Sequence, residues 1–125
     1  MTTATLYERL GRTEGIQALV NTVATAHLAN PTIAKRFEPL TRDPDRLATA
    51  LGHLATFLEA GAGGPAKYEG RSMLEAHRGM NVSGEEYLAA MDDIMGALST
   101  HRIDETTQKE VLFMLYQLKP TIVRL

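Results

Sequence analysis

Apolar residues recur along this chain at intervals of three and four, and no convincing run alternates apolar with polar residues. This period is typical of amphipathic helices, so we predict an all-α fold. The two clearest stripes are Ile16, Leu19, Val20, Val23 and His27 in one segment, and Leu47, Leu51, Leu54 and Leu58 in another.

Polar residues at helix starts divide this pattern into segments. Three pairs have the spacing of a capping box, in which a hydroxyl and a carboxylate satisfy free N–H groups reciprocally: Thr5 with Glu8, Ser72 with Glu75, and Ser83 with Glu86. Asn30-Pro31 and Asp43-Pro44 predict two further starts, the first of a brief helix reaching Phe37. Asp104 caps the last helix.

Glycine and proline mark where the helices end. Gly11 closes the first helix, the run 61–65 closes the fourth, and Gly79 closes a helix of barely two turns. Pro120 predicts a bend in the last helix.

The last two long helices each carry an apolar face, which we expect to turn inward. Their inward residues are Tyr87, Met91, Ile94, Met95 and Leu98, and then Val111, Leu112, Leu115, Leu118 and Ile122. Unequal helices joined by firm turns favour angled, globin-like packing over a symmetric four-helix bundle, although local patterns alone do not separate the two.

Composition narrows the function. The length of 125 residues predicts one domain, spanning residues 1–125. A net charge of −2 argues against binding to nucleic acid or to an acidic membrane. The absence of cysteine excludes disulfides and thiolate metal sites. We find neither a signal peptide nor an apolar run long enough to span a bilayer, so we expect a cytoplasmic protein.

His77 is the first candidate for chemistry. It lies at the end of the short capped helix 72–79, which would fix the direction of its imidazole. A neutral imidazole is a good axial ligand for haem iron, with its other nitrogen bonded to a carbonyl one turn earlier. The alternative is a surface histidine favoured by the helix dipole, and local reasoning alone prefers that alternative.

The context of His77 resembles the group 1 truncated haemoglobins. The opening segment 5–11, TLYERLG, is similar to theirs, and so is the stretch from Phe57 to His77, which contains Gly-Gly-Pro, Tyr-x-Gly and Met-x-x-x-His. Each piece alone is weak, but the joint pattern is specific and extends over nearly the whole chain.

The resemblance implies a truncated-globin fold, a two-over-two helical sandwich around haem b, with His77 as the proximal iron ligand. Phe37 falls where the family packs a phenylalanine on the porphyrin. Further lining residues are implied at Phe57, Tyr68, Met73, Val82, Tyr87, Met91 and Leu112, although each is equally a candidate for ordinary core packing. Lys67, Arg71 and Arg42 would pair with haem propionates, or else are solvated surface charges.

The distal side departs from the family. Members that stabilise bound ligand carry a tyrosine on the second helix and polar residues on the next distal helix. Alignment puts Ala24 at the first position and Ala50 and Leu54 at the others, and none of these side chains donates a hydrogen bond. Bound O2 should therefore leave faster and the haem should oxidise more readily.

Two histidines offer other distal chemistry. His53 lies where some cyanobacterial relatives place a histidine that binds the iron, which predicts either six-coordinate haem or a histidine at the pocket rim. His27 shares a helix face with Ala24 and is the weaker candidate.

Three functions follow as hypotheses. The first is reversible binding or transport of O2, NO or CO, with a reductase as a candidate partner. The second is bis-histidyl electron transfer or redox and gas sensing, and the third is a haem-free helical interaction module. The sequence supplies no convincing acid–base pair, and the apolar distal positions argue against nitric oxide dioxygenase or peroxidase-like turnover, so enzymatic activity stays open.

Overall fold

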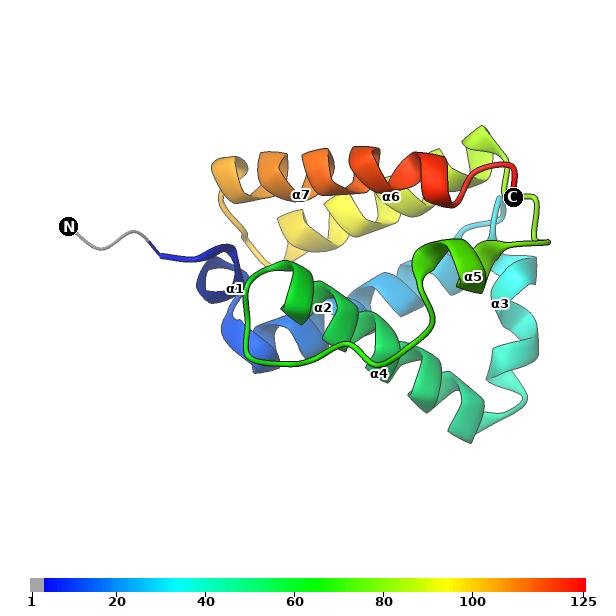
Figure 1. The fold of residues 1–125 in the computed structure, drawn as a ribbon, viewed down its shortest axis with the longest axis horizontal. Coiled ribbons are helices and arrows are strands. Elements are labelled where there is room, and N and C mark those ends of the chain that lie inside the picture. Colours follow the sequence, from blue (N-terminus) through cyan, green and yellow to red (C-terminus); the bar gives the residue numbers. More distant parts are fainter. Residues whose placement is uncertain (1–3) are drawn as a thin grey trace.

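Seven α-helices and a C-terminal 3-10 helix account for most of the computed structural model, which describes residues 4–125 (Figure 1). In chain order they are α1 (Leu6–Arg9), α2 (Arg12–Ala29), α3 (Ala34–Thr41), α4 (Pro44–Gly61), α5 (Met73–His77), α6 (Gly84–Thr100), α7 (Glu105–Leu118) and η1 (Lys119–Thr121). Within this described part, the only β-type pairing is an isolated bridge between Val82 and Val123. The all-α prediction is confirmed.

The helices form two layers. α6 and α7 lie side by side in one layer, and α2 and α4 pack together in the other (Figure 1). α2 also packs against α6 and so joins the layers, while α3 contacts α2 and α4 at one end. The short α5 stands apart from this framework and contacts η1. This is the two-over-two arrangement that the resemblance implies.

Two hydrophobic clusters hold the layers together. The main core joins α2 to α6 and α7 through Leu10, Ile16, Leu19, Val20, Val23, Ala62, Ala97, Leu98, Val111 and Leu115. A smaller proximal cluster consists of buried Val82, Tyr87 and Ile122, with Met73, Met91, Leu118 and Val123 packed around them. The proximal cluster anchors the segment that carries His77.

Most predicted caps are present. Thr5 and Ser83 form full capping boxes, and Asp43 and Asp104 each accept a backbone N–H at the start of their helices. The Ser72 box is only half formed, because its hydroxyl accepts from the backbone of Glu75 but also donates to that carboxylate. Gly79 adopts φ 88°, the left-handed conformation that ends a helix at little cost for glycine.

Four local predictions were wrong. The third helix does not start at Pro31 but at Ala34, after a turn at residues 31–33. It also does not stop near Phe37 but continues to Thr41, because Pro39 lies near its end and removes a single hydrogen bond. The last helix does not bend at Pro120: it ends at Leu118, and η1 follows. Leu112 is 42% exposed rather than inward, because Val111 and Leu115 occupy the face of α7 that meets the core.

The leucine stripe of α4 is left without a complete protein partner. Leu47, Leu51, Leu54 and Leu58 are all only partly buried, and the one fully buried residue of α4 is Glu59. The apolar stripe of a helix normally packs against neighbouring elements of the protein. The stripe therefore leaves a partly exposed apolar surface along α4. Among residues 4–125, no helix is both long and apolar enough to cross a membrane.

Candidate functional site

His77 ends α5 with one nitrogen committed and the other free. Its Nδ1 lies 2.8 Å from the carbonyl oxygen of Met73, one turn earlier, as the sequence predicts. A carbonyl only accepts, so Nδ1 carries the proton and Nε2 keeps its lone pair. The ring is half-buried, and Ser72 at the N-cap fixes the start of the helix that holds it. This tautomer leaves Nε2 free to bind a metal.

Met73 connects this histidine to the proximal cluster. Its side chain packs against Val82, Tyr87 and Ile122, while its carbonyl holds the imidazole. The Tyr87 hydroxyl donates to the carbonyl of Leu115 at 2.5 Å, and burial raises the pKa of this hydroxyl above its ordinary value. Tyr87 therefore stays protonated and ties α6 to α7 beneath the His77 segment.

A distal cavity of about 110 Å³ opens between α2, α3 and α4. Its walls comprise Val23, Ala24, His27, Leu28, Phe37, Leu40, Leu47, Ala50, Leu51 and Leu54. The structure thus brings together the three positions, Ala24, Ala50 and Leu54, that the sequence assigns to the distal side. A cavity of this size is well below the roughly 300–1,000 Å³ of sites for larger organic ligands, and suits a ligand of a few atoms.

His27 is the only one of these ten lining residues with a polar side chain. Its Nδ1 lies 2.7 Å from a carboxylate oxygen of Asp93 on α6, and its ring stacks on Phe37 with centroids 5.1 Å apart. The amide of Asn30 donates to both oxygens of Asp93 at 3.2 Å. The His27 ring is thus held by Asp93 of α6 and Phe37 of α3, and Asn30 at the end of α2 holds Asp93 in turn.

No feature of the sequence singled out Asp93. It lies 66 residues from His27, and no motif or periodicity joins the two. The one available signal was an acidic residue beside the inward positions Met91 and Ile94 of α6. Such a residue needs a polar partner when it is largely buried.

His53 lies on α4 but is exposed and is not part of the distal cavity. Its ring meets Tyr68 edge-on with centroids 6.1 Å apart, and Phe57 meets the same tyrosine at 5.3 Å. The Tyr68 hydroxyl donates to the carbonyl of Arg71 at 2.6 Å. A Cβ at Gly70 would collide with the tyrosine ring, which explains the glycine of the Tyr-x-Gly motif.

The remaining predicted residues lie at the surface. Arg42, Lys67 and Arg71 are exposed, and within residues 4–125 none of them forms an ion pair. Leu112 lies on the outer side of α7, away from the proximal cluster that contains Met73, Val82, Tyr87 and Met91.

One ion pair links the two sides of the site. The guanidinium of Arg36 on α3 donates to both carboxylate oxygens of Glu86 on α6, one at 2.9 Å. Arg36 and, after it, the backbone of Ser83 lower the pKa of Glu86 to about 2. Arg36 precedes Phe37 and Glu86 precedes Tyr87, so the pair ties the distal wall to the proximal cluster.

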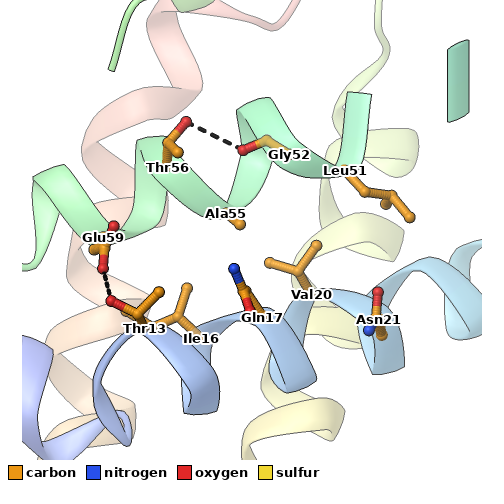
Figure 2. Close-up of a pocket in the computed structure, with 10 residues that line it drawn as sticks. All are labelled: Thr13, Ile16, Gln17, Val20, Asn21, Leu51, Gly52, Ala55, Thr56 and Glu59. Atoms are coloured by element: carbon orange, nitrogen blue, oxygen red, sulfur yellow. Dashed lines mark hydrogen bonds between the residues drawn. The ribbon is translucent and has the colours of Figure 1, made fainter. Parts of the chain in front are cut away.

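A larger groove of about 300 Å³ lies between α2 and α4 and contains none of the predicted site residues (Figure 2). Figure 2 shows Glu59 of α4 reaching Thr13 of α2, whose hydroxyl donates to the carboxylate. The Tyr7 hydroxyl lies 2.8 Å from the same threonine oxygen. These contacts satisfy a buried carboxylate and fix the crossing of the two helices.

Comparison with known proteins identifies the family and supports the fold. The model of the family described as "Bacterial-like globin" matches residues 5–124. The group 1 truncated hemoglobin GlbN of Synechocystis is 31% identical over 86% of both chains. The group 1 truncated hemoglobin of Tetrahymena pyriformis is 30% identical over 75% of this chain and 74% of its own. The ferric form of a truncated hemoglobin from Tetrahymena pyriformis superposes with a TM-score of 0.87 at 23% identity, covering 98% of this chain and 100% of the other.

Proposed function

This chain belongs to the bacterial-like globins, among the group 1 truncated haemoglobins, and on that premise we propose that its single domain, residues 1–125, holds haem b with His77 as proximal ligand and reversibly binds O2, NO or CO. The observation that supports this most directly is the tautomer of His77. Its Nδ1 proton is committed to Met73, so Nε2 offers a lone pair to iron.

The neighbouring residues fit a porphyrin. The incompletely covered stripe of α4, together with Phe37 and Phe57, supplies an apolar surface for one face of the ring. Met73 and the proximal cluster support the other face beside His77. Arg42, Lys67 and Arg71 stand at the surface with no carboxylate partner among residues 4–125, so they are available for propionates.

Haem iron, when bound, supplies the site for the gas ligand, and the chain positions and shields that site. His77 would hold the iron through Nε2, and its bond to the Met73 carbonyl orients the imidazole for that role. The distal cavity, with a volume of about 110 Å³ and a mostly apolar wall, has room for a ligand of a few atoms. Ala24, Ala50 and Leu54 offer that ligand no hydrogen bond, so its retention depends on whatever His27 contributes.

Haem titration of the His77→Ala variant tests this assignment. We expect the haem affinity to fall by at least about 100-fold, since loss of even a supporting partner costs about 10–100-fold in metal affinity. α5 contains no buried residue, so the haem-free variant should keep the helical circular dichroism of the wild type. His101→Ala is the matched control, because this histidine bonds Thr22 between α2 and α6. Equal haem affinity in both variants would overturn the proximal role of His77.

A bis-histidyl haem for electron transfer or redox sensing is the second candidate. It is favoured by one observation, that the His53 ring packs on Tyr68 and makes no hydrogen bond with any residue of the described chain. Sharp, split visible bands in the ferrous protein that collapse in His53→Ala would support this candidate. A single broad visible band in the ferrous deoxy protein would contradict it.

A further inference from the structure

We propose that His27 and Asp93 form a proton-accepting pair in the distal cavity, which favours weak-acid ligands such as hydrogen peroxide, hydrogen sulfide and hydrogen cyanide. This inference rests on the proposed function, because the ligand must have iron to bind. It gives His27 and Asp93 a role that the apolar side chains of Ala24, Ala50 and Leu54 cannot perform, because these have no group that accepts a proton.

The position of the protons follows from the hydrogen bonds. An ionised carboxylate only accepts, so the 2.7 Å contact with Asp93 requires the proton of His27 to lie on Nδ1. Asn30, which donates to both carboxylate oxygens, keeps Asp93 an acceptor and fixes its orientation. Nε2 of the neutral ring is therefore an acceptor with a free lone pair.

Nε2 is also accessible. It makes no hydrogen bond with any residue in the described part of the chain. In that part, every fully buried side-chain nitrogen or oxygen has a hydrogen-bond partner, so an atom without a partner cannot be fully buried. Nε2 must therefore be reachable by a water-sized molecule. The side chain as a whole is only 12% exposed and lines the distal cavity, and we infer that the accessible Nε2 faces this cavity.

Phe37 and Asp93 leave the imidazole little freedom. Phe37 covers one face of the ring, with an interplanar angle of 24°, and Asp93 holds one edge. Because the two ring nitrogens point in widely different directions, Nε2 faces away from Asp93. The hydrogen bond to Asp93 thus sets the tautomer of His27, as the aspartate of a hydrolytic triad sets the tautomer of its histidine.

The proton balance is simple. A ligand H–X enters the cavity and is retained as X⁻, which keeps the electron pair of the broken bond. The proton passes to Nε2 of His27, which becomes doubly protonated while Asp93 faces the new positive charge. O2 and CO have no proton to give, so the pair offers them no such help.

Ligand-association rates test the pair in the haem-loaded protein. We expect His27→Leu to slow cyanide association with the ferric protein, from potassium cyanide at neutral pH, by about 100-fold or more, the range of a positioned general base. CO association with the ferrous protein should change by less than about threefold, because CO carries no proton. Equal changes in both rates would overturn the proposal and assign His27 a purely steric role.

The Asp93→Asn variant tests the pair through two rates, cyanide association and O2 dissociation. The asparagine amide would donate to Nδ1, which moves the imidazole proton to Nε2 and converts the acceptor into a donor. Cyanide association should then fall, whereas O2 dissociation should slow by about 10-fold because bound O2 gains a hydrogen bond. An unchanged rate of cyanide association, or a rate of O2 dissociation that is unchanged or faster, would contradict the pair.

Nuclear magnetic resonance of the haem-free protein provides an independent readout. The ¹⁵N shifts of His27 should show a protonated Nδ1 in the wild type and a protonated Nε2 in Asp93→Asn. An unchanged tautomer in Asp93→Asn would overturn the positioning role of Asp93. Failure of the wild type to take up haem would overturn the proposed function together with this inference, whereas normal uptake with unaltered cyanide rates would overturn the inference alone.

Discussion

The two sides of the site are built differently. On the distal side, His27 lies within the 18-residue helix α2, whose apolar face belongs to the main core. On the proximal side, His77 ends the five-residue helix α5, which contains no buried residue and rests on a cluster of three. Long helices gain their stability from tertiary packing, and a single turn has little of its own. The distal wall is therefore preformed, whereas we expect the proximal segment to gain order from the haem that it is proposed to hold.

The partners of the two imidazoles differ in the same way. His77 bonds a carbonyl of its own helix, four residues away, so its orientation survives as long as one turn survives. His27 bonds a carboxylate on α6, so its orientation requires the assembled fold. A local bond suits a ligand that holds the cofactor, and a long-range bond suits a group that must meet a small ligand at a fixed place.

The largest expected effect compares two isoleucines in the haem-free protein. Ile16 is 1% exposed within the main core, and Ile122 is 8% exposed within the proximal cluster. We expect Ile16→Ala to lower the free energy of unfolding by about 4 kcal/mol and Ile122→Ala by about 2 kcal/mol, since the loss grows with how completely the cavity is enclosed. Urea unfolding of both variants gives the values, and equal losses would remove the contrast between the two sides.

Haem loading should stabilise the two sides unequally. We expect amide exchange in α5 to slow about 30-fold more than exchange in the buried face of α2 when haem binds, a difference of about 2 kcal/mol. The reason is that α5 contains no buried residue and meets only the small proximal cluster through Met73, whereas α2 has four residues buried in the main core. Hydrogen exchange with and without haem measures this, and uniform slowing would show that both sides are preformed.

The Arg36–Glu86 pair should contribute least, and its contribution should depend on pH. The folded-state pKa of Glu86, about 2, lies below the ordinary value of 4.5. The pair therefore stabilises the fold above about pH 4.5, and this stabilisation is lost as the pH falls toward 2. We expect Glu86→Gln to cost about 1 kcal/mol at neutral pH and almost nothing near pH 2, since the exposed fraction of its side chain is 19%.

Thermal unfolding of wild type and Glu86→Gln across this pH range, in the haem-free protein, checks the difference. Glu85→Gln is a matched control, because its carboxylate is exposed and neighbours Glu86 in the first turn of α6. A gap between wild type and Glu86→Gln that widens toward low pH would have the wrong sign for a depressed pKa and would exclude the ion pair as its source.

Local signals predicted the helices well because their causes lie within a few residues. The caps at Thr5, Ser83 and Asp104 each involve partners three residues away, and the bond from His77 to Met73 spans four. The exposure of Leu112 could not be predicted in this way, because it depends on the rotation of α7 against α6, which the sequence pattern leaves uncertain by one position.

The apolar residues of the distal cavity could be predicted from the sequence, but the partner of His27 could not. Alignment placed Ala24, Ala50 and Leu54, which the structure brings to one cavity. The partner of His27 escaped notice because a contact between α2 and α6 leaves no periodic trace in either helix. The sequence therefore indicated no acid–base pair, and the structure supplies a candidate for one.

The sequence separation of His27 and Asp93 has a consequence for how the protein is made. The two residues are 66 positions apart, and synthesis proceeds at about 5–20 residues per second, so several seconds pass between their appearance. His77 is synthesised before Asp93, so the group that would hold the haem exists before the distal pair is complete. In a nascent chain that bound haem early, the distal cavity would lack a fixed imidazole. His27 would be held in place only after α6 had emerged and folded against α2, which brings Asp93 to it.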